Sequence, residues 1–312
     1  MRVLFAGTPA PALPTLTALL DAGHQVVAVA TNPDAQSGRG RRLEPSPVAA
    51  EARRLGLPLL QPDKAREPWF LDAVAELAPD VAVIVAWGCL VPDSLLAVPA
   101  HGWINLHFSL LPAWRGAAPV QRAIMAGETA TGVTTFELVH DLDAGPVYRQ
   151  VPVSLEDGET AGELLTRLAG VGAKALVDSL ADVERGVKPT PQPTAGVTLA
   201  PKVTTDDARI DWAQPSAAID ALVRGVTPAP GAWTVLDGAR LKIVRTAPAS
   251  APGVELQPGQ LLAAKHRLVA GTADGSLELV TVQAAGKPPT DGAAWARGAR
   301  LAQGARLESV HV

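Results

Sequence analysis

The chain has 312 residues, 47% of them hydrophobic and 19% charged, which is enough for two domains with sizeable cores. Its formal net charge of −4 argues against nucleic-acid binding through overall charge alone, because such binders usually carry a basic excess. The single cysteine, Cys89, excludes a disulfide framework, and no apolar run approaches the roughly 18 residues of a membrane span. We therefore expect a cytoplasmic protein with no membrane partner.

The first half of the chain alternates apolar strands with helices. Residues 46–56 show the helix signals most fully, with Ser46 as N-cap, Pro47 at the first helical position and Gly56 at the end. Apolar strands separated by helices are typical of a parallel sheet covered on both faces. We predict an open α/β fold, Rossmann-like with a mainly parallel sheet, over residues 1–186. Its strands are expected at 2–7, 25–31, 81–87 and 102–109, with helices at 13–20, 46–56, 69–79 and 118–127.

The second half changes character twice. Further strands are predicted around 132–139 and 145–153, and a long amphipathic helix at about 160–184 would close the first domain. The segment 187–207 is rich in Pro and Thr and lacks periodicity, so it is predicted to be a linker. A helix near 215–225 and short strands with Asp-Gly turns then predict a small C-terminal β-barrel, OB-like, over 208–312.

Asn105 and His107 are the first candidate site. They lie two residues apart in a predicted strand, so their side chains share a face, and they are near its carboxyl end, where open α/β sheets bind ligands. A buried polar pair costs free energy unless it is hydrogen-bonded, so the pair is either a structural network or a site. A lone buried histidine is more often structural, but the amide neighbour on the same face favours a site.

Asp141 and Asp143 follow in the loop "HDLDAGPVY". In one interpretation, one of them approaches His107, raises its pKa and keeps the imidazole charged or oriented. In the other, both aspartates make local backbone hydrogen bonds in a turn. The spacing does not decide between these two interpretations. An amide and an imidazolium can bind a developing oxyanion while a carboxylate relays a proton, which suits acyl transfer without a covalent intermediate. A nucleophile-elbow motif is absent and the histidines lack metal-ligand spacing, so no metal is expected.

The densest basic cluster is "GRGRRLEPSPV", residues 38–48, with Arg39, Arg41 and Arg42. Such a cluster is usually a solvated loop, but this one follows the second strand on the ligand side of the sheet, which favours phosphate binding. The loop after the first strand lacks the second and third glycines of a dinucleotide fingerprint, so a dinucleotide site is disfavoured.

The segment "INLHFSLLPAWRGAAPVQRAI", together with "LDAGPV", resembles the folate-dependent formyltransferase family. The resemblance implies a catalytic trio of Asn105, His107 and Asp143, which decides between the two aspartates. It further implies that residues 1–186 are the catalytic domain and that 10-formyltetrahydrofolate is the co-substrate. The folate contacts that it implies are Ser109, Leu110, Leu111, Pro112 and Trp87.

Three segments are similar to the branch of this family that acts on charged initiator tRNA: "FAGTP" (5–9), the basic cluster, and "ARIDWAQPSAAIDALVRGVTPAPGAW" (208–233). The similarity runs nearly end to end and implies formylation of the α-amine of initiator Met-tRNA for translation initiation, by a monomer. Residues 208–312 would bind tRNA, in keeping with a small basic excess over 241–312. The implied tRNA contacts are Arg39, Arg41, Arg42, Lys202 and Lys242.

Three rival interpretations remain. A formyltransferase for a sugar nucleotide or a purine precursor would use the same trio, but it would not explain the basic cluster or residues 208–233. A folate- or RNA-binding protein without catalysis is disfavoured because all three trio residues are present. A nucleotide-binding Rossmann protein is disfavoured by the missing glycines.

Overall fold

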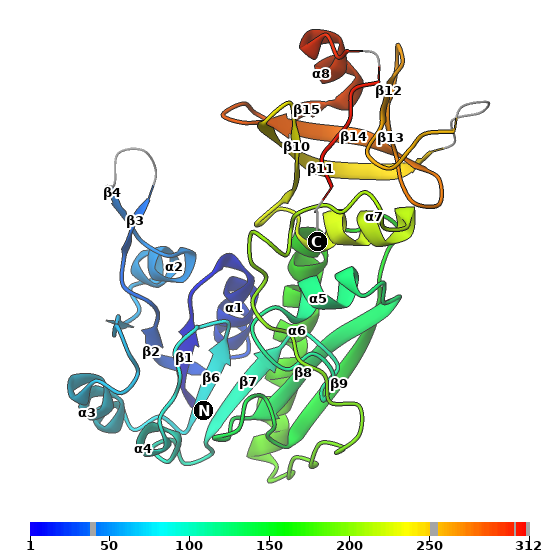
Figure 1. Cartoon of the computed structure of the whole chain (residues 1–312). Coiled ribbons are helices and arrows are strands. Elements are labelled where there is room, and N and C mark those ends of the chain that lie inside the picture. Colours follow the sequence, from blue (N-terminus) through cyan, green and yellow to red (C-terminus); the bar gives the residue numbers. More distant parts are fainter. Residues whose placement is uncertain (38–41, 250–254, 303, 310–312) are drawn as a thin grey trace. The chain divides into compact units, whose positions relative to one another are not determined.

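The computed structural model of the chain describes residues 1–37, 42–249, 255–302 and 304–309. It contains two compact units, each assembled from separate stretches of the chain (Figure 1). Unit 1 consists of Met1–Gly116, Thr131–Val153 and Leu165–Leu199, and unit 2 of Ala117–Ala130, Ser154–Leu164 and Ala200–Val312. The domain limits expected from the sequence, 1–186 and 208–312 with a linker between them, are continuous and remain a prediction.

Unit 1 is built on a mainly parallel sheet, which confirms the predicted α/β class. Among the described residues its strand order is β5-β2-β1-β6-β7-β8-β9. The first five of these strands are parallel neighbours, and β8 runs antiparallel to β7. Their bounds are β1 (Arg2–Gly7), β2 (Gln25–Ala30), β5 (Leu59–Leu60), β6 (Val81–Val85), β7 (Trp103–His107), β8 (Ala130–Glu137) and β9 (Val147–Ser154).

The central strands are buried on both faces, as their continuous apolar sequences predict. Trp103 belongs to the same core cluster as Phe70 and Val74 of α3, whereas Leu106 packs against Gly172 of α6. Side chains at alternate positions of β7 point to opposite faces, so α3 and α6 cover the two sides of the sheet (Figure 1). The helices of this unit are α1 (Leu13–Asp21), α2 (Pro47–Leu55), α3 (Pro68–Leu77), α4 (Asp93–Leu96) and most of α6 (Ala161–Glu184).

Local signals set the ends of α2 as expected. Ser46 Oγ accepts a hydrogen bond from the backbone N–H of Ala49, and Gly56 ends the helix with a left-handed φ of 67°. The short strands β3 (Ala35–Ser37) and β4 (Arg42–Glu44), which pair antiparallel, were not predicted.

Unit 2 carries the predicted antiparallel sheet, with strand order β10-β11-β14-β13-β12 and β15 on β14 among the described residues. Helix α5 packs against α7 where Gly225 lies close to Met125. The elements are α5 (Pro119–Met125), α7 (Ser216–Gly225), β10 (Ala232–Leu236), β11 (Ala239–Ala249), β12 (Leu261–Ala263), β13 (Leu268–Gly271), β14 (Ser276–Ala284), β15 (Thr290–Asp291) and α8 (Gly292–Ala299).

Residues 305–308 close this sheet by lying between its two edge strands. The backbone N–H of Glu308 donates to the carbonyl of Val235 in β10, at 2.9 Å. On the other side, the N–H of Leu261 in β12 donates to Ala305 at 2.8 Å. Each edge strand thereby gains a backbone hydrogen bond with this segment, as expected where a sheet closes toward a barrel. No helix in the described part of the chain is long and apolar enough to cross a membrane.

Candidate active site

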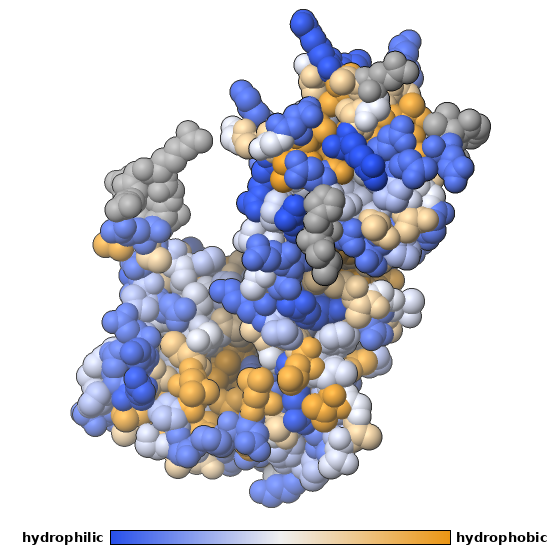
Figure 2. Space-filling model, in the orientation of Figure 1, coloured by the Kyte–Doolittle hydropathy of each residue, from blue (hydrophilic) through white to orange (hydrophobic). Residues whose placement is uncertain are grey.

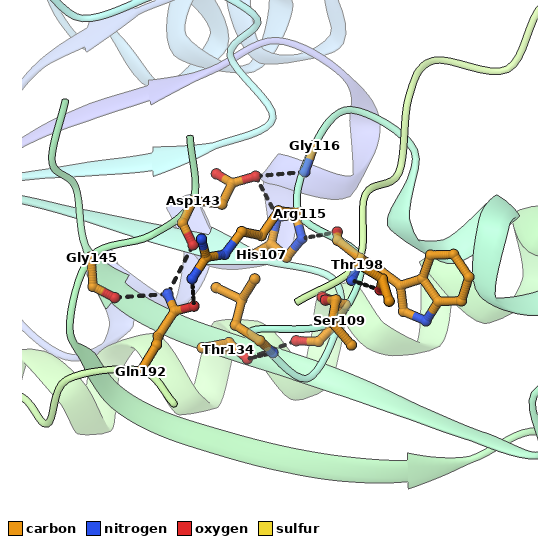
Figure 3. Close-up of polar contacts among 12 residues, drawn as sticks. His107, Ser109, Arg115, Gly116, Thr134, Asp143, Gly145, Gln192 and Thr198 are labelled. Atoms are coloured by element: carbon orange, nitrogen blue, oxygen red, sulfur yellow. Dashed lines mark hydrogen bonds and ion pairs between the residues drawn. The ribbon is translucent and has the colours of Figure 1, made fainter. Parts of the chain in front are cut away.

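His107 ends β7, at the carboxyl edge of the parallel strands of unit 1. Its side chain is 7% exposed, so it needs partners. Nε2 lies 2.8 Å from the carbonyl oxygen of Trp114, and Nδ1 lies 3.7 Å from Asp143 Oδ2. Figure 3 shows His107 beside Asp143. A carbonyl oxygen only accepts, so Nε2 carries the proton and donates it. In the neutral ring, Nδ1 therefore presents a lone pair toward Asp143.

Burial and the neighbouring acceptors shift the pKa of His107 in opposite directions. Burial lowers the pKa of His107 below its ordinary value, and the Asp143 carboxylate and the Trp114 carbonyl offset this only in part. We expected an aspartate to raise this pKa and to keep the ring charged or oriented. Asp143 does raise it, but the cost of withdrawing the imidazolium from water is larger, so the pKa of His107 is lowered overall. Burial thus favours the neutral imidazole over the imidazolium.

Asp143 is the aspartate that meets His107, and Asp141 is exposed. The carboxylate of Asp143 is 10% exposed, and its Oδ2 also accepts the backbone N–H of Gly116 at 2.8 Å. Its backbone has a left-handed φ of 47°, a region that aspartate tolerates better than most residues. The side chain is thus directed at His107 by a turn and a backbone donor.

Asn105 lies two residues before His107 on the same face of β7 and is half-buried. The side-chain amide of Asn105 makes no hydrogen bond within the described part of the chain. By contrast, the side-chain amide of Gln150, on strand β9, donates to Leu111 and Thr134. An amide held on a strand with its donors free can bind an oxygen of a substrate.

The segment 109–112 after β7 is held by polar contacts with the rest of unit 1. Ser109 is fully buried, and its hydroxyl donates to the carbonyl of Ala113 at 2.6 Å. Thr134 of β8 donates to the carbonyl of Ser109 at 2.7 Å and accepts the N–H of Leu111 at 3.1 Å. Leu111 is buried, while Leu110 and Pro112 are half-buried. The loop is therefore fixed beside His107.

Trp87, expected among the folate contacts, lies in the core of unit 1. It is 1% exposed and stacks on Trp103, with ring centroids 6.3 Å apart and the planes within 4°. Its backbone carbonyl accepts the hydroxyl of Thr8. The ring supports the strand ends, and its place among the folate contacts remains a prediction.

The expected tRNA contacts are only partly described. Arg39 and Arg41 lie outside the described residues, and Arg42 is described only through its backbone at the start of β4. Lys202 is exposed, and Lys242 donates from Nζ to the carbonyl of Pro230 at 2.8 Å.

Sequence reasoning missed two backbone groups of this site, the Trp114 carbonyl and the Gly116 N–H. Every residue type carries a backbone carbonyl and every type except proline an N–H, so residue identity cannot reveal them. The left-handed φ of Trp114, 63°, belongs to the turn that presents both groups.

Comparisons with known proteins show the family of this chain. A family model described as "Formyl transferase" matches residues 1–180, and one described as "Formyl transferase, C-terminal domain" matches residues 202–300. The chain is 52% identical to the methionyl-tRNA formyltransferase of Streptomyces coelicolor, over 98% of this chain and 99% of that protein. It is 53% identical to the one of Cutibacterium acnes, over 98% of this chain and 100% of that protein.

Among solved structures, HypX from Aquifex aeolicus in complex with tetrahydrofolic acid is similar with a TM-score of 0.66 and 20% identity. The match covers 95% of this chain and 47% of HypX, so the chain spans about half of that protein and shares its fold over this part. With two family models over most of its length and relatives about half identical to it, the chain belongs to the formyltransferase family, in the branch of the methionyl-tRNA formyltransferases.

Proposed function

We propose that this chain transfers the formyl group of 10-formyltetrahydrofolate to the α-amine of methionine on initiator Met-tRNA, giving formylmethionyl-tRNA for translation initiation. The observation that carries the proposal is the His107–Asp143 pair, with Nε2 fixed on the Trp114 carbonyl and the free amide of Asn105 on the same face. The names of the relatives support the choice of acceptor.

Asn105 is the oxyanion donor in this proposal. When the amine attacks the formyl carbon, negative charge develops on the formyl oxygen, and the Asn105 N–H donates to it. A donor held on a strand needs no reorganisation during the reaction, so its removal costs about 10²–10³ in turnover.

His107 is the proton carrier, with Asp143 as its counter-charge. The lone pair of Nδ1 takes the proton that the attacking amine loses, directly or through a water, and the same proton then moves to the leaving folate nitrogen. Between the two steps the ring is an imidazolium, which Asp143 at 3.7 Å stabilises. A ring whose burial favours the neutral form suits this role better than a permanently charged one.

The residues present fit a folate with a flat, partly apolar ring. Leu142, next to Asp143, is 62% exposed, and Leu90, after β6, is 86% exposed. Figure 2 shows hydrophobic side chains gathered on the visible face of unit 1. Exposed apolar side chains next to a polar site are typical of ligand-binding surfaces. The folate contacts in this proposal are Ser109, Leu110, Leu111, Pro112 and Trp87.

The tRNA contacts in this proposal are Arg39, Arg41, Arg42, Lys202 and Lys242. The basic cluster would contact phosphates near the acceptor end, and unit 2 would hold the rest of the tRNA. We propose that the protein acts as a monomer, since Asn105, His107 and Asp143 all come from one chain, and that it works in the cytoplasm.

The test is formyl transfer from 10-formyltetrahydrofolate to three acceptors in parallel: charged initiator Met-tRNA, glycinamide ribonucleotide and an amino-sugar nucleotide. We expect product on the tRNA alone, a 10²–10³-fold lower kcat for Asn105→Ala, and severe loss for His107→Ala and Asp143→Asn. The matched control is Asp141→Asn, which changes an exposed carboxylate two residues from Asp143. Product on a small acceptor, or near-normal turnover of Asn105→Ala, would contradict the proposal.

A further inference from the structure

Residues 187–199 are the first part of the segment 187–207 that we expected to be a linker. They contact the two loops that carry Asp143 and the Trp114 carbonyl. Thr190 forms two backbone hydrogen bonds with Val147 at the start of β9, at 2.7 and 2.8 Å. Farther along, Thr198 accepts the backbone N–H of Trp114 on its hydroxyl at 2.8 Å, and its carbonyl accepts that of Arg115 at 2.9 Å. These contacts lie within unit 1, so the segment is part of the catalytic unit.

Gln192 is the residue of this segment that reaches both loops of the site (Figure 3). Its amide nitrogen donates to the carbonyls of Asp143 and Gly145, each at 2.8 Å, and so uses both of its hydrogens. Its amide oxygen accepts Arg115 Nη2 at 2.7 Å. The side chain is half-buried while residues 193–199 are exposed. The three bonds fix the orientation of the amide, because a flipped amide would set its oxygen against two carbonyls.

The contacts of Gln192 close a ring through the catalytic carboxylate. Gln192 binds Arg115; the next residue, Gly116, donates to Asp143 Oδ2; and the carbonyl of Asp143 accepts from Gln192. Asp143 and Trp114 both have left-handed backbones, with φ values of 47° and 63°. Such a conformation in a residue other than glycine persists only where its surroundings hold it. The segment 187–199 holds both residues, Asp143 through Gln192 and Trp114 through Thr198.

We propose that Gln192 is a positioning residue for formyl transfer: it clamps the Asp143 turn to the Arg115–Gly116 turn, so that the Asp143 carboxylate faces His107. This inference rests on the proposed function, because it assigns Gln192 a role through Asp143. Gln192 does not itself contact the reacting atoms. A displacement of a catalytic group by about 1 Å can cost about 10²-fold in rate, so loss of the clamp should appear in kcat.

The experiment is a double-mutant cycle between Gln192 and Asp143, measured as kcat and KM for formyl transfer to charged initiator Met-tRNA. We expect Gln192→Ala to lower kcat about 10–100-fold with little change in KM. Gln192→Glu has the same shape and keeps an acceptor for Arg115, but it cannot donate to the two carbonyls, so it should lose as much. In the Asp143→Asn background, Gln192→Ala should cost less than about threefold, because the carboxylate that it positions is already gone. Thr194→Ala, an exposed position of the same segment, is the matched control and should behave as wild type.

The cycle separates a positioning role from general support of the fold. A residue that only stabilised the fold would lower the thermal midpoint and would cost the same factor in both backgrounds. That result, or a normal kcat for Gln192→Glu, overturns the inference. If Asp143→Asn is fully active, the role of Asp143 in the proposed function is wrong, and the inference on Gln192 falls with it. If Asp143→Asn loses most of its activity while Gln192→Ala has a normal kcat, only the role of Gln192 is wrong.

Discussion

At the scale of single residues, the site depends on which nitrogen of His107 carries the proton. The Trp114 carbonyl assigns it to Nε2, which leaves Nδ1 as the base beside Asp143. The sequence identifies the histidine and, by resemblance, the aspartate. It cannot assign the tautomer, because the partner is a backbone carbonyl seven residues away, presented by a left-handed turn. Nor can it give the direction of the pKa, which burial decides.

The lowered pKa of His107 predicts a dependence of stability on pH. Unfolded His107 takes up a proton near its ordinary pKa of about 6.5, whereas the buried ring takes it up only at lower pH. The free energy of unfolding should therefore decrease as the pH falls from about 7.5 to about 5.5, and less so in His107→Gln. Urea unfolding at the two pH values measures this, with exposed His266→Gln as the control. Equal pH dependence in wild type and His107→Gln would contradict a lowered pKa.

At the scale of elements, the best predicted parts are those with their own local signals. Helix α2 has an N-cap, a proline and a terminal glycine in its sequence, and it forms between them. The strands β3 and β4 have three residues each and were missed, because so short a strand is defined by its partner rather than by its composition. The helix α8 was missed as well, in a stretch with three glycines between 292 and 304.

Gly145 is the position in the turn between β8 and β9 where a side chain has least room. A Cβ at this position would lie 1.7 Å from the carbonyl oxygen of Glu137, the last residue of β8. We expect Gly145→Ala to lower the free energy of unfolding by about 1–3 kcal/mol and to lower kcat, because Asp143 lies two residues away. The control is Gly170→Ala on α6, where nothing lies within 4 Å of the added Cβ. It should raise the free energy of unfolding by at most about 1 kcal/mol. A fully stable Gly145→Ala protein in a urea titration would show that the turn adapts without cost.

At the scale of the whole molecule, phosphate contacts should make binding of the tRNA dependent on salt although the net charge is −4. We expect the double variant Arg41→Ala, Arg42→Ala to raise the KM for charged initiator tRNA. The slope of log KM against log salt should fall by about two, one for each lost phosphate contact. KM measured between about 50 and 200 mM salt tests this. Arg54→Ala removes an exposed arginine that pairs with Glu51 and should leave the slope unchanged.

The fold class and the order of most elements follow from the amino-acid sequence alone, and the resemblance in sequence points to the trio. Apolar runs, caps and turn residues act over a few positions, and the pattern around Asn105, His107 and Asp143 is specific enough to indicate the family. How distant segments meet is seen in the folded chain and not in its sequence. Gln192 reaches Asp143 across 49 residues, and residues 305–308 close the sheet between β10 and β12. Each contact has at least one backbone group as a partner, and since nearly every residue carries such groups, no residue pattern reveals which of them is used.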